Sequence, residues 1–360
     1  MKPTIAWLVP KPIKGSGGIR EIYNKIQHLC SQGHECHAFV EGDASVYALA
    51  DQVEAFYGPN DCVLHSGWDH DAEQFDMIFA TIWYSAKEVA KAPARVKKAY
   101  MIQDYEAWFN PMGDGYAWAE ESYQLGLHPV CLGRWLPNVL HRQFGVGSHF
   151  FDFCCERQLY FPFKPFVKRE LALCYIYQPE KPRRCSQIGL QALHLLKRAM
   201  PDVTIYLYGS DEIGEVPFPH VQLGILRSHE INDLYNRCSL GFCMSSSNPS
   251  RIPFEMMSAG LPVVDIYREN NLFDFPEAGV LLAADNSRAI AKALAQCLSD
   301  RERLRSMSAF GVEWMTQNSM EKEYDQFYAS VQAILLGNGP TITPELPPRM
   351  YQKDAVQSHL

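Results

Sequence analysis

The sequence predicts an α/β protein with two doubly wound parallel sheets, and three observations lead to this class. The chain has 360 residues, more than a single domain usually holds, so two domains are favoured. Short apolar segments alternate with amphipathic ones along most of its length, as in parallel sheets joined by crossover helices. The stretch from Met244 to Val264 shows this rhythm at its clearest, as strand, polar turn, helix and strand. Glu255, one turn into that helix, is expected near the carboxyl ends of the strands, where such sheets bind ligands.

The first half of the chain has the alternation expected of one doubly wound domain. Buried strands are predicted at residues 5–9, 35–40, 76–80, 98–102, 129–132 and 148–153. Helices are predicted at residues 19–32, 85–91, 115–125 and 136–144. Gly33 is a suitable stop for the first helix, because glycine readily adopts the left-handed conformation that ends helices.

A proline-containing segment, residues 161–166, separates this half from a second one, because proline opposes both helix and central strand. Further strands are predicted at residues 172–177, 204–209, 240–244, 263–266 and 280–281, and helices at 186–200, 229–237, 255–259 and 287–298. An amphipathic region follows at 301–336. The predicted domains are residues 1–165 and 166–315, then a helix at 316–336 that returns to the first domain and a loose tail at 337–360.

Composition restricts the classes of function. With 47% hydrophobic and 21% charged residues the chain can bury ordinary cores, and its net charge of −8 argues against a nucleic-acid partner. Eleven cysteines without framework spacing, and no secretory leader before the first strand, predict reduced thiols in the cytoplasm. No apolar run is long enough to span a membrane. Peripheral attachment to its inner face stays open, since Trp135 and Leu136 could contact lipid or pack in the core.

A glycine-rich loop, Gly15 to Gly18, precedes the first helix, and backbone N–H groups at a helix start bind anions. As a dinucleotide fingerprint the loop fails, because Arg20 stands where the third glycine is needed. Two interpretations stay open: a flexible active-site loop that holds acceptor or diphosphate, and a structural turn.

A basic turn, Lys181-Pro182-Arg183-Arg184, follows the first strand of the second domain. Arginine binds diphosphate oxygens with a fixed fork, and a solvated surface turn is the alternative.

The segment Gln103-Asp104-Tyr105-Glu106 follows a predicted strand in the first domain, and exposed aromatics come after it. Carboxylates beside aromatic faces suit carbohydrate, while a loop network satisfied within the protein is an equal alternative.

Two histidine-containing segments have residue types that bind metals. Asp69-His70-Asp71 has the pattern of a paired-aspartate metal motif, but its polar context favours a solvated loop. On a strand, His34 and His37 would point to opposite faces, so they are not expected to share zinc.

Taken together, several segments resemble the retaining glycosyltransferases of family 4. These are Gly33-His34-Glu35-Cys36, Arg183-Arg184, Leu223-Gly224, Leu234-Tyr235 and PFEMMSAGLPVV. More narrowly, IQDYEAWFNPMGDGYAWAEESY and NPSRIPFE are similar to bacterial rhamnosyltransferases that build surface glycans from dTDP-L-rhamnose. The resemblance implies the GT-B fold, in which two Rossmann-like domains face each other across a cleft and the second holds the nucleotide.

The resemblance also implies roles for individual residues. Glu255 matches the acid that binds the ribose, Arg183 and Arg184 match the catalytic basic pair at the diphosphate, and Gly17 and Gly18 match the loop that approaches the phosphates. Donor contacts are further expected from the turn before Glu255, namely from Asn248, Ser250 and Arg251. Ser247 stands where the broad family carries an acid, eight residues before Glu255, so the sugar-contacting role is unassigned.

The implied enzyme transfers a hexose, expected to be L-rhamnose from dTDP-L-rhamnose, onto an oligosaccharide or lipid-linked glycan acceptor with retention of configuration. Arg183, Arg184 and helix N-termini would stabilise the leaving diphosphate, so neither a metal nor another cofactor is required. Asp104, or alternatively Glu106, would orient the acceptor. The competing interpretations are a catalytically silent GT-B module that binds a sugar nucleotide or scaffolds an assembly, and another enzyme of this architecture, such as an epimerase or a dehydrogenase.

Overall fold

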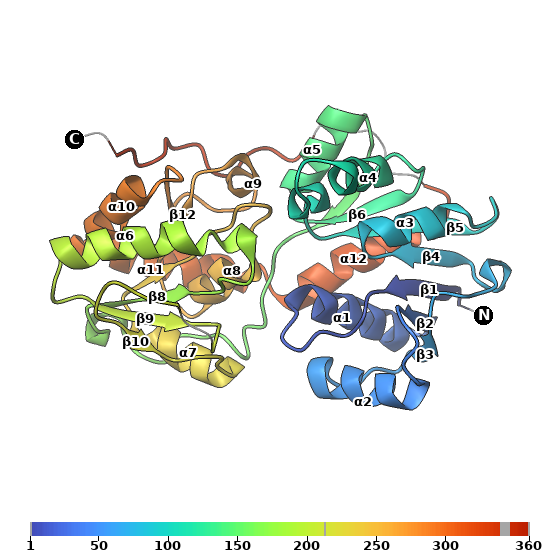
Figure 1. Ribbon diagram of the computed structural model, residues 1–360, viewed down its shortest axis with the longest axis horizontal. Coiled ribbons are helices and arrows are strands. Elements are labelled where there is room, and N and C mark those ends of the chain that lie inside the picture. The colour runs from blue at the N-terminus through green and yellow to red at the C-terminus, as the bar shows by residue number, and fades with distance from the viewer. Residues whose placement is uncertain (1, 212–213, 339–345, 359–360) are drawn as a thin grey trace. The chain divides into compact units, whose positions relative to one another are not determined.

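Apolar segments of the first half form a seven-stranded, fully parallel sheet in the order β3-β2-β1-β4-β5-β6-β7 (Figure 1). The strands are β1 (Thr4–Val9), β2 (Glu35–Val40), β3 (Val63–Ser66), β4 (Met77–Ala80), β5 (Lys97–Ile102), β6 (His128–Leu132) and β7 (His149–Phe151). The computed structural model describes residues 2–211, 214–338 and 346–358. This sheet belongs to unit 1, Met1–Phe151 and Tyr324–Pro347.

The helices of unit 1 pack against this sheet or, as with α4, against a neighbouring helix. They are α1 (Gly17–Ser31), α2 (Val46–Tyr57), α3 (Trp83–Ala90), α4 (Asp114–Ser122), α5 (Trp135–Phe144) and most of α12 (Met320–Leu335), with short 3-10 turns η1 (Ala72–Gln74) and η2 (Glu106–Phe109). Trp7 of β1 stacks on Phe79 of β4 at 4.1 Å between ring centroids, and Phe327 of α12 lies 6.2 Å from Trp7. The late helix α12 is therefore part of the core of unit 1.

Unit 2, Asp152–Glu323 and Pro348–Leu360, has a six-stranded parallel sheet in the order β10-β9-β8-β11-β12-β13. Its strands are β8 (Ala172–Ile176), β9 (Thr204–Tyr208), β10 (Val221–Gln222), β11 (Leu240–Phe242), β12 (Val263–Ile266) and β13 (Val280–Ala283). Its helices are α6 (Ser186–Ala199), α7 (Ser228–Arg237), α8 (Arg251–Ser258), α9 (Glu269–Leu272), α10 (Ser287–Ser299) and α11 (Arg301–Thr316), with 3-10 turns η3 (Phe166–Lys168) and η4 (Pro182–Arg184).

Each sheet has one point where the strand order reverses, between β1 and β4 in unit 1 and between β8 and β11 in unit 2. Connections leave toward opposite faces at such a point, so the carboxyl ends of the two strands border a crevice that binds ligands. The glycine loop follows β1, and the basic turn follows β8. Both predicted loops therefore lie at the ligand-binding edge of their own sheet.

The predicted elements correspond to observed ones, and within the described residues four α-helices and strands were not predicted: α2, β3, β10 and α9. Helix α2 buries Leu49, Val53 and Tyr57, a spacing of four that is a genuine helical signal, with Ser45 as its cap. Strand β3 is only partly buried and β10 has two residues, so neither has an apolar run. The amphipathic region at 301–336 is two helices, α11 and α12.

The structure places the boundary between the units after Phe151, where the sequence suggested residue 165. Residues 161–164 are attached to α7, because side chains of that helix satisfy their backbone. Oδ1 of Asn232 accepts from the N–H of Phe161 at 3.1 Å, and Oδ1 of Asn236 accepts from the N–H of Phe163 at 2.9 Å. This segment therefore belongs to unit 2.

The tail at 337–360 was expected to be loose, but residues 346–358 contact unit 2. These are the residues of the tail beyond 338 that the structure describes. The N–H of Tyr351 donates to the carbonyl of Leu272 at 3.0 Å, and its hydroxyl accepts from the N–H of Leu282 at 3.2 Å. Val356 forms a parallel bridge with Ala283 of β13. Two apolar side chains and an available strand edge are enough to hold a segment whose composition alone predicts disorder.

Candidate functional site

Two turns meet where the strand order of the unit 2 sheet reverses. The basic turn, residues 181–184, follows β8, and the polar turn, residues 243–250, follows β11. Oγ of Ser246 donates a hydrogen bond to the carbonyl of Arg183 at 2.7 Å and joins the two turns. The candidate site is this carboxyl edge of the sheet, as the sequence predicted.

Arg184 is the most deeply buried cation of the basic turn, with 9% of its surface exposed. Its Nη1 lies 3.7 Å from Sγ of Cys243 on the polar turn. Its Nε has no hydrogen-bond partner among the residues that the structure describes. A buried charged donor that makes no hydrogen bond is costly, so this N–H is available to an anionic ligand.

The neighbouring cations reinforce the positive character of the basic turn. Burial, followed by the charges of Arg184 and Arg183, lowers the pKa of Lys181, while Glu180 acts in the opposite direction. Arg183 is partly exposed and Lys181 is partly buried. Three cations within four residues therefore create a local field that favours a polyanion such as a diphosphate.

Asp265, in β12, is a component of the site that the sequence did not reveal. Its side chain is fully buried and accepts hydrogen bonds from the N–H and hydroxyl of Ser245, at 2.9 and 2.8 Å, and from the N–H of Ile266. Burial raises the pKa of Asp265 to about 7, although these hydrogen bonds and the charge of Arg184 counteract the increase. The carboxylate fixes the start of the polar turn and adds a group that titrates near neutrality.

A second pair of side chains holds the same turn from α9. Nδ2 of Asn270 and Nδ2 of Asn271 each donate to the carbonyl of Ser245 at 3.0 Å, and both residues are buried. Nδ2 of Asn271 also contacts the carbonyl of Ile266 at 2.8 Å. The N–H and hydroxyl of Ser245 are thus bound by Asp265, and its carbonyl is bound by two asparagines of α9.

Glu255 lies one turn into α8 and is half-buried. Burial raises the pKa of Tyr160, Tyr208 and Tyr235, and the charge of Glu255 contributes to the shift of each one. The hydroxyls of Tyr208 and Tyr235 lie 2.8 Å apart. The carboxylate therefore lies within electrostatic range of Tyr160, of Tyr208 at the end of β9 and of Tyr235 in α7.

Three further residues of the polar turn, Ser247, Asn248 and Ser250, have surroundings that the structure defines. Ser247 and Asn248 are buried, with 3% and 5% of their surfaces exposed. Ser250 is the N-cap of α8, and its hydroxyl accepts from the N–H of Ile252 at 3.1 Å. The cap explains a serine at this position without a donor contact.

Arg251, for which the sequence predicts a donor contact, forms an ion pair with Glu323. Its Nη1 and Nη2 each lie 2.6 Å from a carboxylate oxygen of Glu323, which is fully buried. Nη1 also donates to the carbonyl of Cys154 at 2.7 Å. The pair joins the start of α8 to the start of α12, and its 72-residue separation explains why no local pattern predicted it.

In unit 1, Gly17 and Gly18 form the first turn of α1, with Ser16 as N-cap. The carbonyl of Gly18 accepts from Nε2 of Gln103 at 3.0 Å. A Cβ added to Gly17 would meet no described atom within 4 Å, so the space next to this residue at the helix start is unfilled by the part of the chain that the structure describes. Gly15 has a φ of 77°, which favours glycine.

Asp104 and Glu106 follow β5, and the structure separates their roles. Asp104 is partly exposed. Glu106 is buried and accepts from the N–H of Trp83, the first residue of α3, at 2.7 Å. Burial raises the pKa of Glu106 to about 8, and Asp104 adds to the shift. Of the two acids proposed to orient an acceptor, Glu106 serves the fold as a helix cap, and Asp104 remains accessible.

Several residues that the sequence singled out belong to structural networks. Asp71 caps η1, and Nδ1 of His70 lies 2.7 Å from the carbonyl of Trp68. Among the described residues, no group of three or more His, Cys, Asp or Glu side chains could hold a metal ion. Trp135 and Leu136 are buried, which matches core packing rather than lipid contact. All eleven cysteines carry free thiols.

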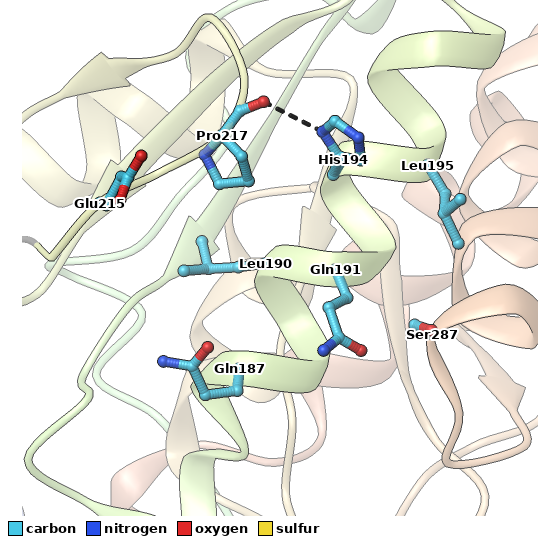
Figure 2. Close-up of a pocket in the computed structure, with 8 residues that line it drawn as sticks. All are labelled: Gln187, Leu190, Gln191, His194, Leu195, Glu215, Pro217 and Ser287. Atoms are coloured by element: carbon cyan, nitrogen blue, oxygen red, sulfur yellow. Dashed lines mark hydrogen bonds between the residues drawn. The ribbon is translucent and has the colours of Figure 1, made fainter.

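A cavity of about 370 Å³ lies elsewhere in unit 2, against α6 (Figure 2). Its wall includes Gln187, Leu190 and His194 of that helix, and Nδ1 of His194 lies 3.0 Å from the carbonyl of Pro217. It contains none of the cations or acids described above, so it does not define the candidate site.

Solved structures with the same arrangement of strands and helices define the fold class. Sucrose-phosphate synthase from Thermosynechococcus elongatus superposes with a TM-score of 0.70 at 11% identity, covering 93% of this chain and 100% of the other. HepE from Anabaena in complex with UDP gives 0.70 at 15% identity over the same shares. A TarM variant from S. aureus, in complex with fondaparinux, alpha-GlcNAc-glycerol and UDP, gives 0.70 at 8% identity, over 92% of this chain and 99% of the other. The chain has the GT-B fold, with two Rossmann-like α/β domains.

Sequence comparison gives a narrower relationship for unit 2. Residues 171–295 match the family described as WsaF, C-terminal domain. The O-antigen biosynthesis protein RfbC of Myxococcus xanthus is 27% identical over 257 residues, which is 70% of this chain and 20% of that protein. The chain thus spans a fifth of the length of this curated relative. In the described residues, no helix combines the length and apolar character needed to cross a bilayer.

Proposed function

We propose that the chain is a glycosyltransferase that moves a sugar from a nucleotide-sugar donor onto a growing bacterial surface glycan. The observation that carries the proposal is Arg184, whose buried Nε has no partner among the described residues at the carboxyl edge of the unit 2 sheet. The name of the Myxococcus relative, an O-antigen biosynthesis protein, supports a surface glycan as the product. The donor we propose is dTDP-L-rhamnose, on the sequence resemblance described above.

In this proposal the basic turn binds the diphosphate of the donor. Arg184 supplies its Nε–H, and Arg183 and Lys181 supply further positive charge. Glu255 accepts a hydrogen bond from the one free hydroxyl of the donor's deoxyribose, because its carboxylate lies one turn into α8 near buried tyrosines. Asn248 and Ser250 shape the turn that leads to Glu255.

The reaction requires little acid–base chemistry of the protein. The bond between the anomeric carbon and the diphosphate oxygen breaks, and a bond from the acceptor hydroxyl oxygen forms on the same face, with retention. The acceptor proton passes to the leaving diphosphate, whose developing charge Arg183 and Arg184 stabilise. These cations take the part that a metal would otherwise play. In unit 1, Asp104 orients the acceptor, and the start of α1 at Gly17 and Gly18 offers N–H groups to an anionic group.

One observation favours a second candidate, a GT-B module that binds a sugar nucleotide without turnover. Ser247 occupies the place where the resembled family has an acid, and it is buried at 3% exposure. In that case the site would bind the donor, and Arg183→Ala would weaken binding with no transfer to lose. Release of free nucleotide diphosphate with an acceptor present separates the candidates.

The test is a thermal-shift panel with dTDP, UDP and NAD, followed by a transfer assay with dTDP-L-rhamnose. A ligand that binds the native state raises the melting temperature, so we expect a rise with dTDP and none with NAD. We further expect Arg183→Ala and Glu255→Ala to fold normally and lose transfer. No response to any nucleotide diphosphate would contradict both candidates.

A further inference from the structure

Four aromatic side chains follow the carboxyl edge of the unit 1 sheet, and we call them the aromatic row: Trp68, Tyr84, Trp83 and Trp108. All four are at least partly exposed, and Trp108 has 43% of its surface exposed. Partly exposed large rings at the ligand-binding edge of a doubly wound sheet are unusual for a surface without a partner.

The first part of the row is attached to the ends of β1 and β2. Nε1 of Trp68 donates to the carbonyl of Val9, the last residue of β1, at 3.1 Å. The hydroxyl of Tyr84 donates to Glu41, the residue after β2, at 3.0 Å. The rings of Trp68 and Tyr84 stack at 5.5 Å, and Trp83 meets Tyr84 edge-on at 5.3 Å. These rings are held by the protein before any ligand arrives.

The second part of the row is attached to the end of β5. The N–H of Trp83 donates to Glu106, and Trp108 follows in the same 3-10 turn, η2. The ring of Trp108 packs at 5.1 Å from Tyr105 and 5.2 Å from the buried Trp135. One side of the indole is therefore supported by the core, while a large part of the ring stays exposed.

The row follows the ends of four adjacent strands, β2, β1, β4 and β5. Neighbouring strands lie about 4.8 Å apart, so the row extends over roughly 14 Å, longer than one sugar ring. Carboxylates are interspersed with the rings, with Glu41 at one end and Asp104 toward the other. Aromatic faces bind the C–H faces of sugars and carboxylates accept from their hydroxyls, whereas these acids would repel an anionic lipid surface.

We propose that the aromatic row is a binding site for an oligosaccharide chain, which it contacts at several successive sugars. The inference rests on the proposed function in so far as this chain is the acceptor glycan. It adds that recognition extends beyond the sugar that is modified. Because the rings are already fixed, binding costs little side-chain entropy.

The test is binding of the full chain to an immobilised panel of bacterial surface oligosaccharides of graded length, from monosaccharides upward. We expect affinity to rise with the number of sugars, and Trp108→Ala to weaken binding of the longer chains about tenfold. Trp108→Phe should restore most of the affinity, because it keeps an aromatic face. The matched control is Trp118→Ala, which removes an indole of similar exposure outside the row, one that packs with Lys87.

Melting temperature with and without dTDP, measured on the same variants, separates the two proposals. If the protein binds dTDP but no glycan, or binds glycans equally well after Trp108→Ala, the aromatic row is not a carbohydrate site and the proposed function still stands. Glycan binding that depends on Trp108, without a response to dTDP, UDP or any other nucleotide diphosphate, would overturn the proposed function and leave the row in place. Binding of a monosaccharide as tight as that of a longer chain would contradict an extended site.

Discussion

The carboxylate of Asp265 accepts hydrogen bonds from both the N–H and the hydroxyl of Ser245, at 2.9 and 2.8 Å. This contact fixes the polar turn after β11 to the neighbouring strand β12, and it places a titratable acid within the field of Arg184. The pKa of Asp265 is about 7 in the folded protein, because burial disfavours its charged form. The anion affinity of the site is therefore expected to depend on pH.

We predict that dTDP affinity falls between about pH 6 and about pH 8, and that this fall is about fivefold larger in the wild type than in an Asp265→Asn variant. Above its pKa the carboxylate is ionised and offsets part of the attraction between Arg184 and the diphosphate. Calorimetric titration of both proteins cancels the ionisation of dTDP itself. Equal pH dependence in the two proteins would show that Asp265 does not influence the diphosphate site.

A second pH effect concerns stability and Glu106. Burial raises its pKa from 4.5 to about 8. Between these two pH values the folded protein keeps the carboxyl proton, whereas the unfolded chain has lost it. The contribution of Glu106 to the free energy of unfolding is fully present below about pH 4.5 and is lost as the pH rises through about 8. Glu106→Gln keeps an acceptor for the N–H of Trp83 and removes the ionisation.

Urea unfolding should therefore show Glu106→Gln gaining stability relative to the wild type between these pH values, on the order of 3 kcal/mol. Glu121→Gln, at an exposed position, is the matched control and should follow the wild type. A constant difference between Glu106→Gln and the wild type at all pH values would contradict the buried, protonated state of Glu106.

The ion pair of Arg251 and Glu323 predicts a structural role rather than a donor contact. Arg251→Ala would leave the fully buried carboxylate of Glu323 without its cation, and we expect a loss of about 3 kcal/mol in the free energy of unfolding. Adding Glu323→Gln should recover part of this loss. The affinity of the folded variant for dTDP should stay within about twofold of the wild type. A large loss of affinity with unchanged stability would return Arg251 to the donor site.

Glu255 is predicted to read the sugar of the nucleotide rather than its phosphates. Glu255→Gln should weaken dTDP binding about tenfold, the cost of losing a charge-assisted hydrogen bond, and should leave inorganic pyrophosphate binding unchanged. Arg184→Lys should weaken both ligands, since it removes the forked donor. Glu313→Gln, an exposed acid on α11, controls for net charge. Equal losses for dTDP and pyrophosphate in Glu255→Gln would contradict a ribose contact.

The sequence predicted most of the fold, because parallel strands buried on both faces appear as short apolar runs. Strand β3 escaped because it is partly exposed, and β10 because two residues carry no periodicity. The order of the tail was not predicted for a different reason. Its order depends on the edge offered by Ala283 and on one buried ring, Tyr351, and composition describes neither.

The candidate site was predictable in part. The basic turn and Glu255 stand out because charged residues directly follow apolar strands, and the structure places both at the carboxyl edge of one sheet. Asp265 is missed because a single acid inside the run from Val263 to Ile266 looks like part of a strand. The ion pair of Arg251 is not predictable because its partner, Glu323, is set by the fold and lies far away in sequence.

The most direct test of the central proposal is a structure of the chain with dTDP bound. We predict the diphosphate within hydrogen-bonding distance of Nε of Arg184 and the sugar hydroxyl within hydrogen-bonding distance of the Glu255 carboxylate. A nucleotide bound elsewhere, for example in the cavity beside His194, with Nε of Arg184 left uncontacted, would contradict it.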